Sequence, residues 1–151
     1  LPDRLAPSAL FDALRAAADA HVGGMAVRWQ CDARDGELLC NRDTLVGTVL
    51  NLIDNAIRYS PQGGTVELRA WSEEGNVLLQ VRDQGIGIPA EKLPVIFERF
   101  GQAHGARYGG LGLGLTISQG IIEQHGGRIW AESPGVEGEG STFHVCMPLQ
   151  S

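Results

Sequence analysis

Residues 42–59 read RDTLVGTVLNLIDNAIRY and carry the most regular helical pattern in the chain. At about 100° per residue, one side of this segment is almost entirely aliphatic between residues 45 and 57. Asn41 precedes the first turn as a candidate N-cap, and Pro61 follows the last turn. The pattern predicts an amphipathic helix whose apolar side packs against the rest of the domain.

Segments that alternate apolar and polar residues predict strands on both sides of this helix. A hairpin is predicted from residues 65–71 and 76–82, which flank the turn Glu73-Glu74-Gly75. Residues 25–31 and 37–40 predict two more strands joined at Asp35-Gly36. Closing strands are predicted over residues 128–133 and 141–147, and further helices over 8–20, 90–97 and 112–125.

Together these elements predict an α/β fold of two layers, in which a mixed, mostly antiparallel sheet of about five strands packs on about three helices. The length of 151 residues fits a single domain, with a lead-in helix in residues 1–24 and a core over residues 25–151.

Composition excludes several classes of function. The net charge of −6 lacks the basic footprint that sequence-independent nucleic-acid binding needs. Three cysteines and four histidines show no metal-binding spacing, and the odd cysteine count fits a reducing compartment. Since no secretion signal or membrane span is visible, we expect a cytoplasmic domain.

The polar side of the segment 42–59 carries Asn51 and Asn55 one turn apart, followed by Arg58 and Tyr59. A neutral amide oxygen suits a Mg²⁺ ion whose other ligands are phosphate oxygens and water. Arg58 is placed to reach phosphate, and the Tyr59 ring can stack on a base. The alternative interpretation is an ordinary solvated helix face.

A glycine-rich turn, Asp83-Gln84-Gly85-Ile86-Gly87-Ile88-Pro89, directly follows a predicted strand. Its glycines allow a sharp turn and a close approach to a planar ligand. A carboxylate at Asp83 can accept a hydrogen bond from an exocyclic amine such as that of adenine. Because many hairpins end in Asp-Gly, a purely structural turn is the alternative.

A second glycine-rich segment, Gly109-Gly110-Leu111-Gly112-Leu113-Gly114-Leu115, opens a predicted helix. Alternate glycines expose successive N–H groups near a helix N-terminus, which predicts an anion cradle, with a structural hinge as the alternative. In chain order, the magnesium helix, the adenine turn and this cradle would complete a Mg-ATP site.

These motifs resemble the catalytic and ATP-binding domain of bacterial sensor histidine kinases, in the superfamily shared with type II topoisomerases, MutL and a heat-shock chaperone. The resemblance implies the Bergerat ATP-binding fold. Residues 51–60 resemble its N box, 83–89 the first glycine box, 96–100 the F box, 110–115 the second glycine box, and 140–143 with 147–149 the closing strand.

The resemblance implies that Asn55 binds Mg²⁺, with Asn51 beside it in a catalytic position. It further implies that Arg58 contacts phosphate, that Tyr59 packs on the adenine and that Asp83 accepts its amine hydrogen. The other nucleotide-binding residues that it implies are Gly85, Gly87, Ile88, Gly110, Leu111, Gly112, Leu113, Gly114 and Ser141, the last of these supporting Asp83.

The resemblance also implies a mobile lid over residues 101–109. Gln102 stands where many members have an arginine, which leaves Arg107 as the catalytic contact to the γ-phosphate. The phosphoryl group would pass to a histidine on a helical dimerisation domain, and then to a response regulator. No histidine here has the acceptor context, so the chain looks like the monomeric catalytic domain of a longer protein.

Three other functions remain open from the sequence. A hydrolytic ATPase of the same superfamily uses a carboxylate one turn before the magnesium ligand, where this chain has the amide of Asn51. A serine kinase of the anti-sigma type, or a non-catalytic nucleotide-binding module, would keep the same binding residues. The identity of the phosphate acceptor distinguishes these functions.

Overall fold

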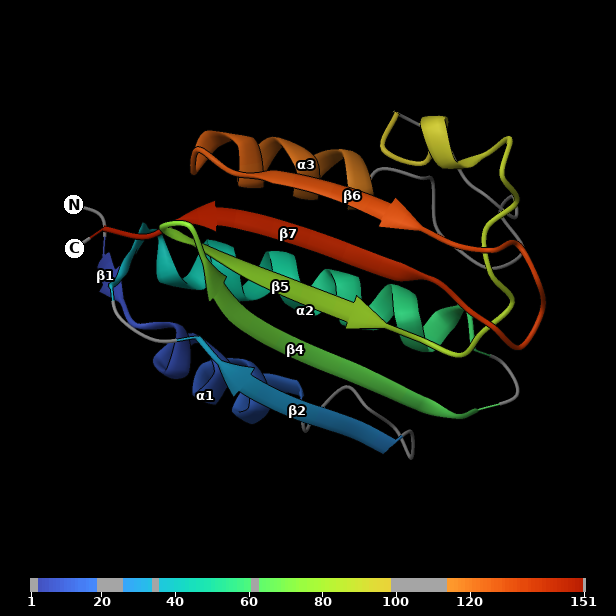
Figure 1. The fold of residues 1–151 in the computed structure, drawn as a ribbon, viewed down its shortest axis with the longest axis horizontal. Coiled ribbons are helices and arrows are strands. Elements are labelled where there is room, and N and C mark those ends of the chain that lie inside the picture. The colour runs from blue at the N-terminus through green and yellow to red at the C-terminus, as the bar shows by residue number, and fades with distance from the viewer. Residues whose placement is uncertain (1–2, 19–25, 34–35, 61–62, 99–113, 151) are drawn as a thin grey trace.

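The computed structural model describes residues 3–18, 26–33, 36–60, 63–98 and 114–150. In this part of the chain, five strands form one mixed sheet in the order β2-β4-β5-β7-β6, and three α-helices cover one face of it (Figure 1). The predicted two-layer α/β fold is therefore confirmed. The elements of these two layers are α1 (Pro7–Ala18), β2 (Ala26–Asp32), α2 (Arg42–Arg58), β4 (Thr65–Glu73), β5 (Asn76–Arg82), α3 (Gly114–Gln124), β6 (Arg128–Glu132) and β7 (Thr142–Pro148).

The hydrophobic core lies between the sheet and the apolar sides of α1 and α2. Alternate residues of the strands point into it, because side chains of a strand alternate between its two faces. The aliphatic side of α2 is fully buried at its centre, and this fixes the helix against β4 and β5. The most deeply buried side chains of this core include Leu14, Leu45, Leu52, Ile53, Val66 and Val81.

The predicted β4–β5 hairpin is confirmed, whereas the predicted pairing of residues 25–31 with 37–40 is wrong. β2 pairs in parallel with β4, and β3 (Leu38–Cys40) pairs antiparallel with β1 (Asp3–Leu5), a strand that the sequence did not predict. The Trp29 ring of β2 meets Phe11 of α1 edge to face, with ring centroids 5.9 Å apart. The chain segment between the parallel strands β2 and β4 contains α2, which forms part of the crossover that parallel strands need.

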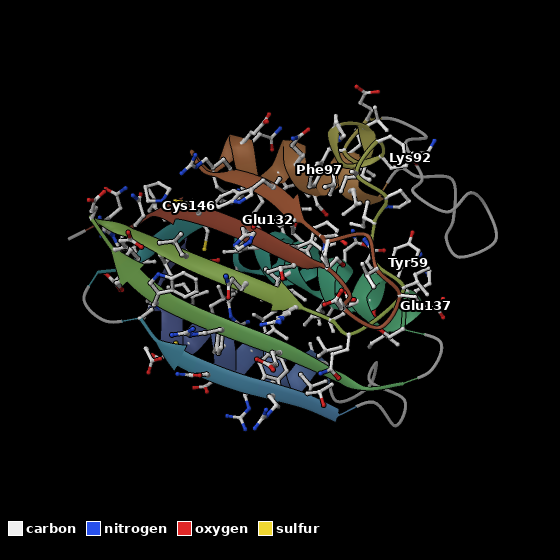
Figure 2. The ribbon with its side chains drawn as sticks, turned by 45° about the vertical axis from the view of Figure 1, so that its right-hand side comes forward. Tyr59, Lys92, Phe97, Glu132, Glu137 and Cys146 are labelled. Atoms are coloured by element: carbon white, nitrogen blue, oxygen red, sulfur yellow. The ribbon has the colours of Figure 1, made fainter. Side chains whose placement is uncertain are left out.

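The other face of the sheet carries a cluster of stacked side chains on β6 and β7. The Trp130 and His144 rings are nearly parallel, with centroids 5.0 Å apart, and the Arg128 guanidinium lies 4.8 Å from the Trp130 centroid. His144 Nε2 lies 3.0 Å from Glu132, which Figure 2 labels, and its Nδ1 lies 3.4 Å from the Gln80 amide nitrogen. An amide that donates to Nδ1 favours the neutral ring with its proton on Nε2.

Folding stability should therefore depend on the protonation of His144. Burial lowers the pKa of His144, and the nearby Glu132 only partly opposes this shift. A lowered pKa in the folded protein means that the stabilisation is complete above the unfolded value of 6.5 and is lost as the pH falls below it. We expect urea unfolding between about pH 7.5 and about pH 5 to show a steeper loss of stability in the wild type than in His144→Gln. The difference between the two curves of unfolding free energy against pH isolates the contribution of His144, because the other titratable groups are common to both proteins. Parallel curves would contradict this expectation.

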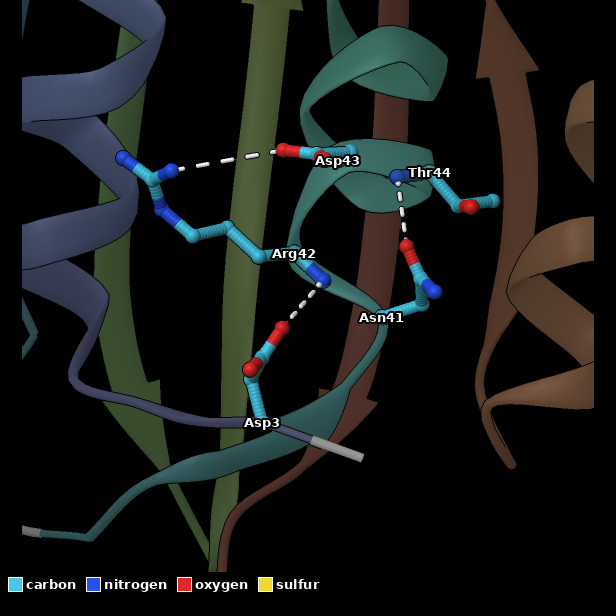
Figure 3. A network of polar contacts seen from close by, with 5 residues as sticks. All are labelled: Asp3, Asn41, Arg42, Asp43 and Thr44. Carbon is cyan, nitrogen blue, oxygen red and sulfur yellow. Dashed lines mark hydrogen bonds and ion pairs between the residues drawn. The ribbon is translucent and has the colours of Figure 1, made fainter. Parts of the chain in front are cut away.

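The first turn of α2 is fixed by two side chains that accept its free N–H groups (Figure 3). Asn41 Oδ1 accepts a hydrogen bond from Thr44 N at 3.0 Å, so the predicted N-cap is confirmed. Asp3 Oδ2 accepts one from Arg42 N at 3.1 Å, which links β1 to the helix. Both contacts define the start of α2, and the candidate site lies at the opposite end of the same helix.

Candidate functional site

The glycine turn after β5 is organised around Asp83. This residue continues the inward-pointing series of Val77, Leu79 and Val81, so its side chain faces the helical layer, where it is 2 % exposed. Asp83 Oδ1 accepts hydrogen bonds from Gly85 N at 2.9 Å and from Ser141 N at 3.2 Å. Its Oδ2 accepts one from the Ser141 hydroxyl at 2.8 Å. The structure thus brings together Asp83 and Ser141, as the resemblance implied.

The chemistry of Asp83 follows from its burial and from these donors. Burial raises the pKa of Asp83, while the hydrogen bonds from Gly85 and Ser141 lower it by a smaller amount. A carboxylate offers about four lone-pair sites, and three of them are occupied here. No described residue occupies the remaining site on Oδ2, so Asp83 can accept a hydrogen bond from a ligand there without losing its supports.

Glycine is required at position 85 because the turn packs directly on the C-terminal end of α2. A Cβ atom at Gly85 would collide with the Tyr59 carbonyl oxygen. Ile86 N donates a hydrogen bond to the same oxygen at 2.9 Å. Gly87 has a φ of +79°, in the left-handed region that favours glycine. These contacts pack the glycine turn on the C-terminal end of α2, where Figure 2 labels Tyr59.

The loop between β6 and β7 forms a wall on the other side of the turn, at the end of the sheet where Figure 1 shows both segments together. The Gly85 carbonyl accepts hydrogen bonds from Gly138 N at 2.9 Å and from Gly140 N at 3.1 Å. Gly140 has a φ of +67°, and a Cβ there would collide with the Asp83 carbonyl oxygen. The turn is therefore fixed on two sides, which suits it to hold a rigid ligand.

The polar side of α2 is covered rather than solvated along its middle. Thr48 and Asn55 are only 4 % and 7 % exposed, so the alternative of an ordinary solvated face is wrong for them. Asn51 Nδ2 donates a hydrogen bond to the Ser118 hydroxyl at 3.1 Å, and Ser118, on α3, is 2 % exposed. Only Arg58, at the end of the helix, is exposed among the predicted phosphate and magnesium residues of α2.

Part of the predicted site lies outside the described residues, namely the lid over 101–109. The F box is described as far as Phe97 and Glu98, and the Phe97 carbonyl accepts a hydrogen bond from Thr116 Oγ1 of α3 at 2.9 Å. This bond links the F box to the helix that follows the second glycine segment. The individual site residues that fall outside the description are Arg107, Gly110, Leu111, Gly112 and Leu113.

In the part of the chain that the structure describes, no group of three or more histidine, cysteine, aspartate or glutamate side chains is arranged to hold a metal ion. Within the same ranges, no helix has both the length and the apolar character to cross a membrane.

Sequence reasoning missed two residues that shape this site, Ser118 and Ser133. Ser118 gave no signal, because it lies in an apolar helical segment. Ser133 directly precedes a loop rich in glycine, and that composition indicated a turn without indicating what the turn contacts.

The sequence is similar to a known protein family and to named sensor kinases. The profile of the family described as histidine kinase-, DNA gyrase B-, and HSP90-like ATPase matches residues 40–151. The chain is 52 % identical over 100 residues to the sensor protein kinase FleS of Pseudomonas aeruginosa, a match that covers 66 % of this chain and 25 % of FleS. It is 38 % identical over 122 residues to the sensor histidine kinase WalK of Bacillus subtilis, covering 78 % of this chain and 20 % of WalK. The chain thus spans about a quarter or less of these two relatives.

Solved structures show the same fold. The mycobacterial sensor histidine kinase MprB superposes with a TM-score of 0.80 at 26 % identity, covering 99 % of both chains. Full-length ShkA, solved in complex with AMPPNP, gives a TM-score of 0.83 at 25 % identity over 99 % of this chain and 31 % of that protein.

Proposed function

Because this chain belongs to the family of histidine kinase-, DNA gyrase B- and HSP90-like ATPases, we propose that it binds Mg-ATP between the glycine turn, α2 and α3. We propose further that the γ-phosphoryl group passes to a histidine on a separate helical domain. The observation that carries the proposal is the buried Asp83 carboxylate, which Gly85 and Ser141 hold with one acceptor site left on Oδ2.

Adenine fits this acceptor site for a chemical reason. Its exocyclic amine donates a hydrogen bond, whereas guanine presents a carbonyl oxygen at the corresponding edge. A carbonyl facing Asp83 would leave two acceptors opposed in a closed site, which is strongly unfavourable. Tyr59 lies at the same end of the molecule and offers an aromatic ring to the base, and Gly85 leaves the backbone free of a side chain. We therefore assign adenine recognition to the turn and the end of α2.

The residues of α2 fit a magnesium ion that is held mainly by the nucleotide. Mg²⁺ commonly takes one or two protein oxygens and completes its shell with phosphate oxygens and water. Asn55 offers an amide oxygen from a buried position on the helix side that also carries Asn51. Bound there, the ion would neutralise charge on the phosphates. Arg58, which is exposed, would contact the phosphates from the helix end.

Transfer to an acceptor fits Asn51 better than hydrolysis does. An amide cannot take a proton from water, so position 51 provides no general base. The Ser118 hydroxyl engages the amide nitrogen of Asn51, which fixes the orientation of the side chain. Phosphoryl transfer depends mainly on positioning and charge neutralisation, and an ordered amide contributes to the first of these. We propose Arg107 as the contact to the γ-phosphate.

The relatives suggest the setting in which this domain works. FleS and WalK are named sensor kinases and are about four to five times longer than the segment they share with this chain. We propose that residues 1–151 act as a single, monomeric catalytic domain in the cytoplasm, where ATP is available. Its partners would be a helical domain carrying the acceptor histidine and, through that histidine, a response regulator.

Incubation with γ-labelled ATP tests the proposed reaction. Alone, the chain should turn ATP over very slowly and gain no stable label, because its own histidines lack the acceptor context. Adding the helical acceptor domain in trans should transfer the label to that domain. The rate should be below that of a covalently linked pair, because the effective concentration is lower. The product should be acid-labile and base-stable, as expected of a phosphoramidate.

Two other outcomes would overturn this assignment. Strong acid-stable label on the isolated chain would indicate a serine kinase. Rapid phosphate release without an acceptor would indicate a hydrolase. An acceptor domain that lacks its histidine is the matched control, and it should remain unlabelled under the same conditions.

A further inference from the structure

Ser133, the first residue after β6, uses the full hydrogen-bonding capacity of its hydroxyl. It donates to the Gly140 carbonyl at 2.8 Å and accepts from Ile88 N at 2.9 Å and from Gly135 N at 3.1 Å. A serine hydroxyl has one donor and two acceptor lone pairs, so no capacity remains for a ligand. Ser133 belongs to none of the motifs identified in the sequence, and its role must lie in what it joins.

The hydroxyl joins the far end of the glycine turn to the support of Asp83. Ile88 closes the turn and is 5 % exposed. Gly140 directly precedes Ser141, whose backbone and side chain both donate to the Asp83 carboxylate. The two hydrogen bonds of Ser133, to Ile88 and to Gly140, therefore fix the distance between Ile88, at the end of the glycine turn, and the Asp83 carboxylate that Ser141 supports. Backbone bonds from the loop to Gly85 hold the middle of the turn, but they do not reach Ile88.

We propose that Ser133 is a positioning residue of the nucleotide site and contributes to its preference for adenine. This inference rests on the proposed function, because it assumes that adenine binds between Ile88 and Asp83. Without the hydroxyl, the Ile88 amide and the Gly140 carbonyl lose their common partner. Asp83 and Ile88 are then no longer held in one arrangement before the nucleotide arrives, and part of the binding free energy goes into ordering them.

Calorimetric titration with ADP and with GDP tests this role. Ser133→Ala should lower ADP affinity about tenfold, the effect expected from a lost hydrogen bond, and should also lower the ratio of ADP to GDP affinity. Ser133→Thr keeps the hydroxyl and should restore both values. Ser133→Cys, whose thiol bonds weakly, should behave as Ser133→Ala does, and it decides the matter if the alanine variant fails to fold.

Two control variants separate the possible outcomes. Val77→Ala truncates a buried side chain at the opposite end of β5 and should leave ADP affinity unchanged despite its cost in stability. If Val77→Ala and Ser133→Ala lose ADP affinity equally, the effect of Ser133→Ala is general destabilisation, and the inference is overturned. The inference is also overturned if Ser133→Ala keeps the ADP affinity and the base preference of the wild type while Asp83→Asn weakens ADP binding. If Asp83→Asn also leaves ADP affinity unchanged, the proposed adenine site itself is wrong.

Discussion

Replacing Asp83 with asparagine should weaken ADP binding about 30-fold, on the order of 2 kcal/mol, while leaving the fold intact. The asparagine oxygen can keep the hydrogen bonds from Gly85 N and Ser141 N, and its amide can donate to the Ser141 hydroxyl after that hydroxyl rotates. The support of the side chain therefore survives. The free lone pair on Oδ2 does not, because an NH₂ group now faces the amine of adenine and two donors oppose each other.

Calorimetry with ADP and urea unfolding without nucleotide measure these two effects separately. Asp43→Asn is a matched control, because Asp43 is exposed in the first turn of α2, at the far end of that helix. Unchanged ADP affinity in a folded Asp83→Asn protein would remove this residue from the adenine site. A large loss of stability would instead show that the carboxylate is chiefly a structural group.

The pH dependence of ADP binding gives a second test of the same residue. Burial raises the pKa of Asp83 above the ordinary value of 3.8. Protonation removes the acceptor, so ADP affinity should fall on acidification at a higher pH than an unperturbed carboxyl would give. Asp83→Asn should lack this fall. Identical acid profiles for the two proteins would contradict the assignment.

Replacing Asn55 with alanine should abolish the gain in ATP affinity that Mg²⁺ provides. The variant removes the proposed protein ligand, and the loss should be about tenfold or more, since even outer-shell partners of metal sites are worth about that much. We expect the helix to remain folded, because alanine favours helix and the aliphatic side of α2 is unchanged.

ATP titrations with and without Mg²⁺ provide the measurement. Asn76→Ala is a matched control, since Asn76 lies at the start of β5, away from the proposed ligand site. An equal magnesium effect in wild type and Asn55→Ala would show that another group binds the ion. A loss of ATP affinity without Mg²⁺ would indicate that Asn55 contacts the nucleotide directly.

Local patterns in the sequence predicted the helices and strands themselves better than they predicted which strands pair with each other. The helix predicted over 42–59, its Asn41 cap and the hairpin around Glu73-Glu74-Gly75 depend on neighbouring residues, and all three are present, with the helix ending at Arg58. The α-helix predicted over 90–97 is wrong, because the structure has only a short 3-10 helix there, Leu93–Val95. The parallel pairing of β2 with β4 depends on burial between segments far apart in the chain, for which a turn-like Asp35-Gly36 was a misleading guide. A three-residue strand such as β1 has too little pattern of its own to be detected.

In the candidate site too, features that depend on neighbouring residues were predicted, and contacts between distant segments were not predicted from the residues alone. Asp83, Gly85 and Gly87 were predicted because their residue types restrict backbone and chemistry within one short segment. The contact of Asp83 with Ser141 spans 58 residues and was expected only through family resemblance. Ser133 was missed because a serine after a strand is common, and its importance depends entirely on which three backbone groups fold around it.

The position of Asp83 links ligand recognition to the alignment of the sheet. It follows Arg82, the last paired residue of β5, on the side of the strand that faces the core. A slip of one residue between β5 and a neighbouring strand would bring Arg82 beneath the nucleotide and turn the carboxylate toward solvent. Length changes within these strands should therefore abolish binding even when the chain still folds, whereas changes in the β4–β5 turn should be harmless. The proposed nucleotide recognition therefore depends on the register of the central strands.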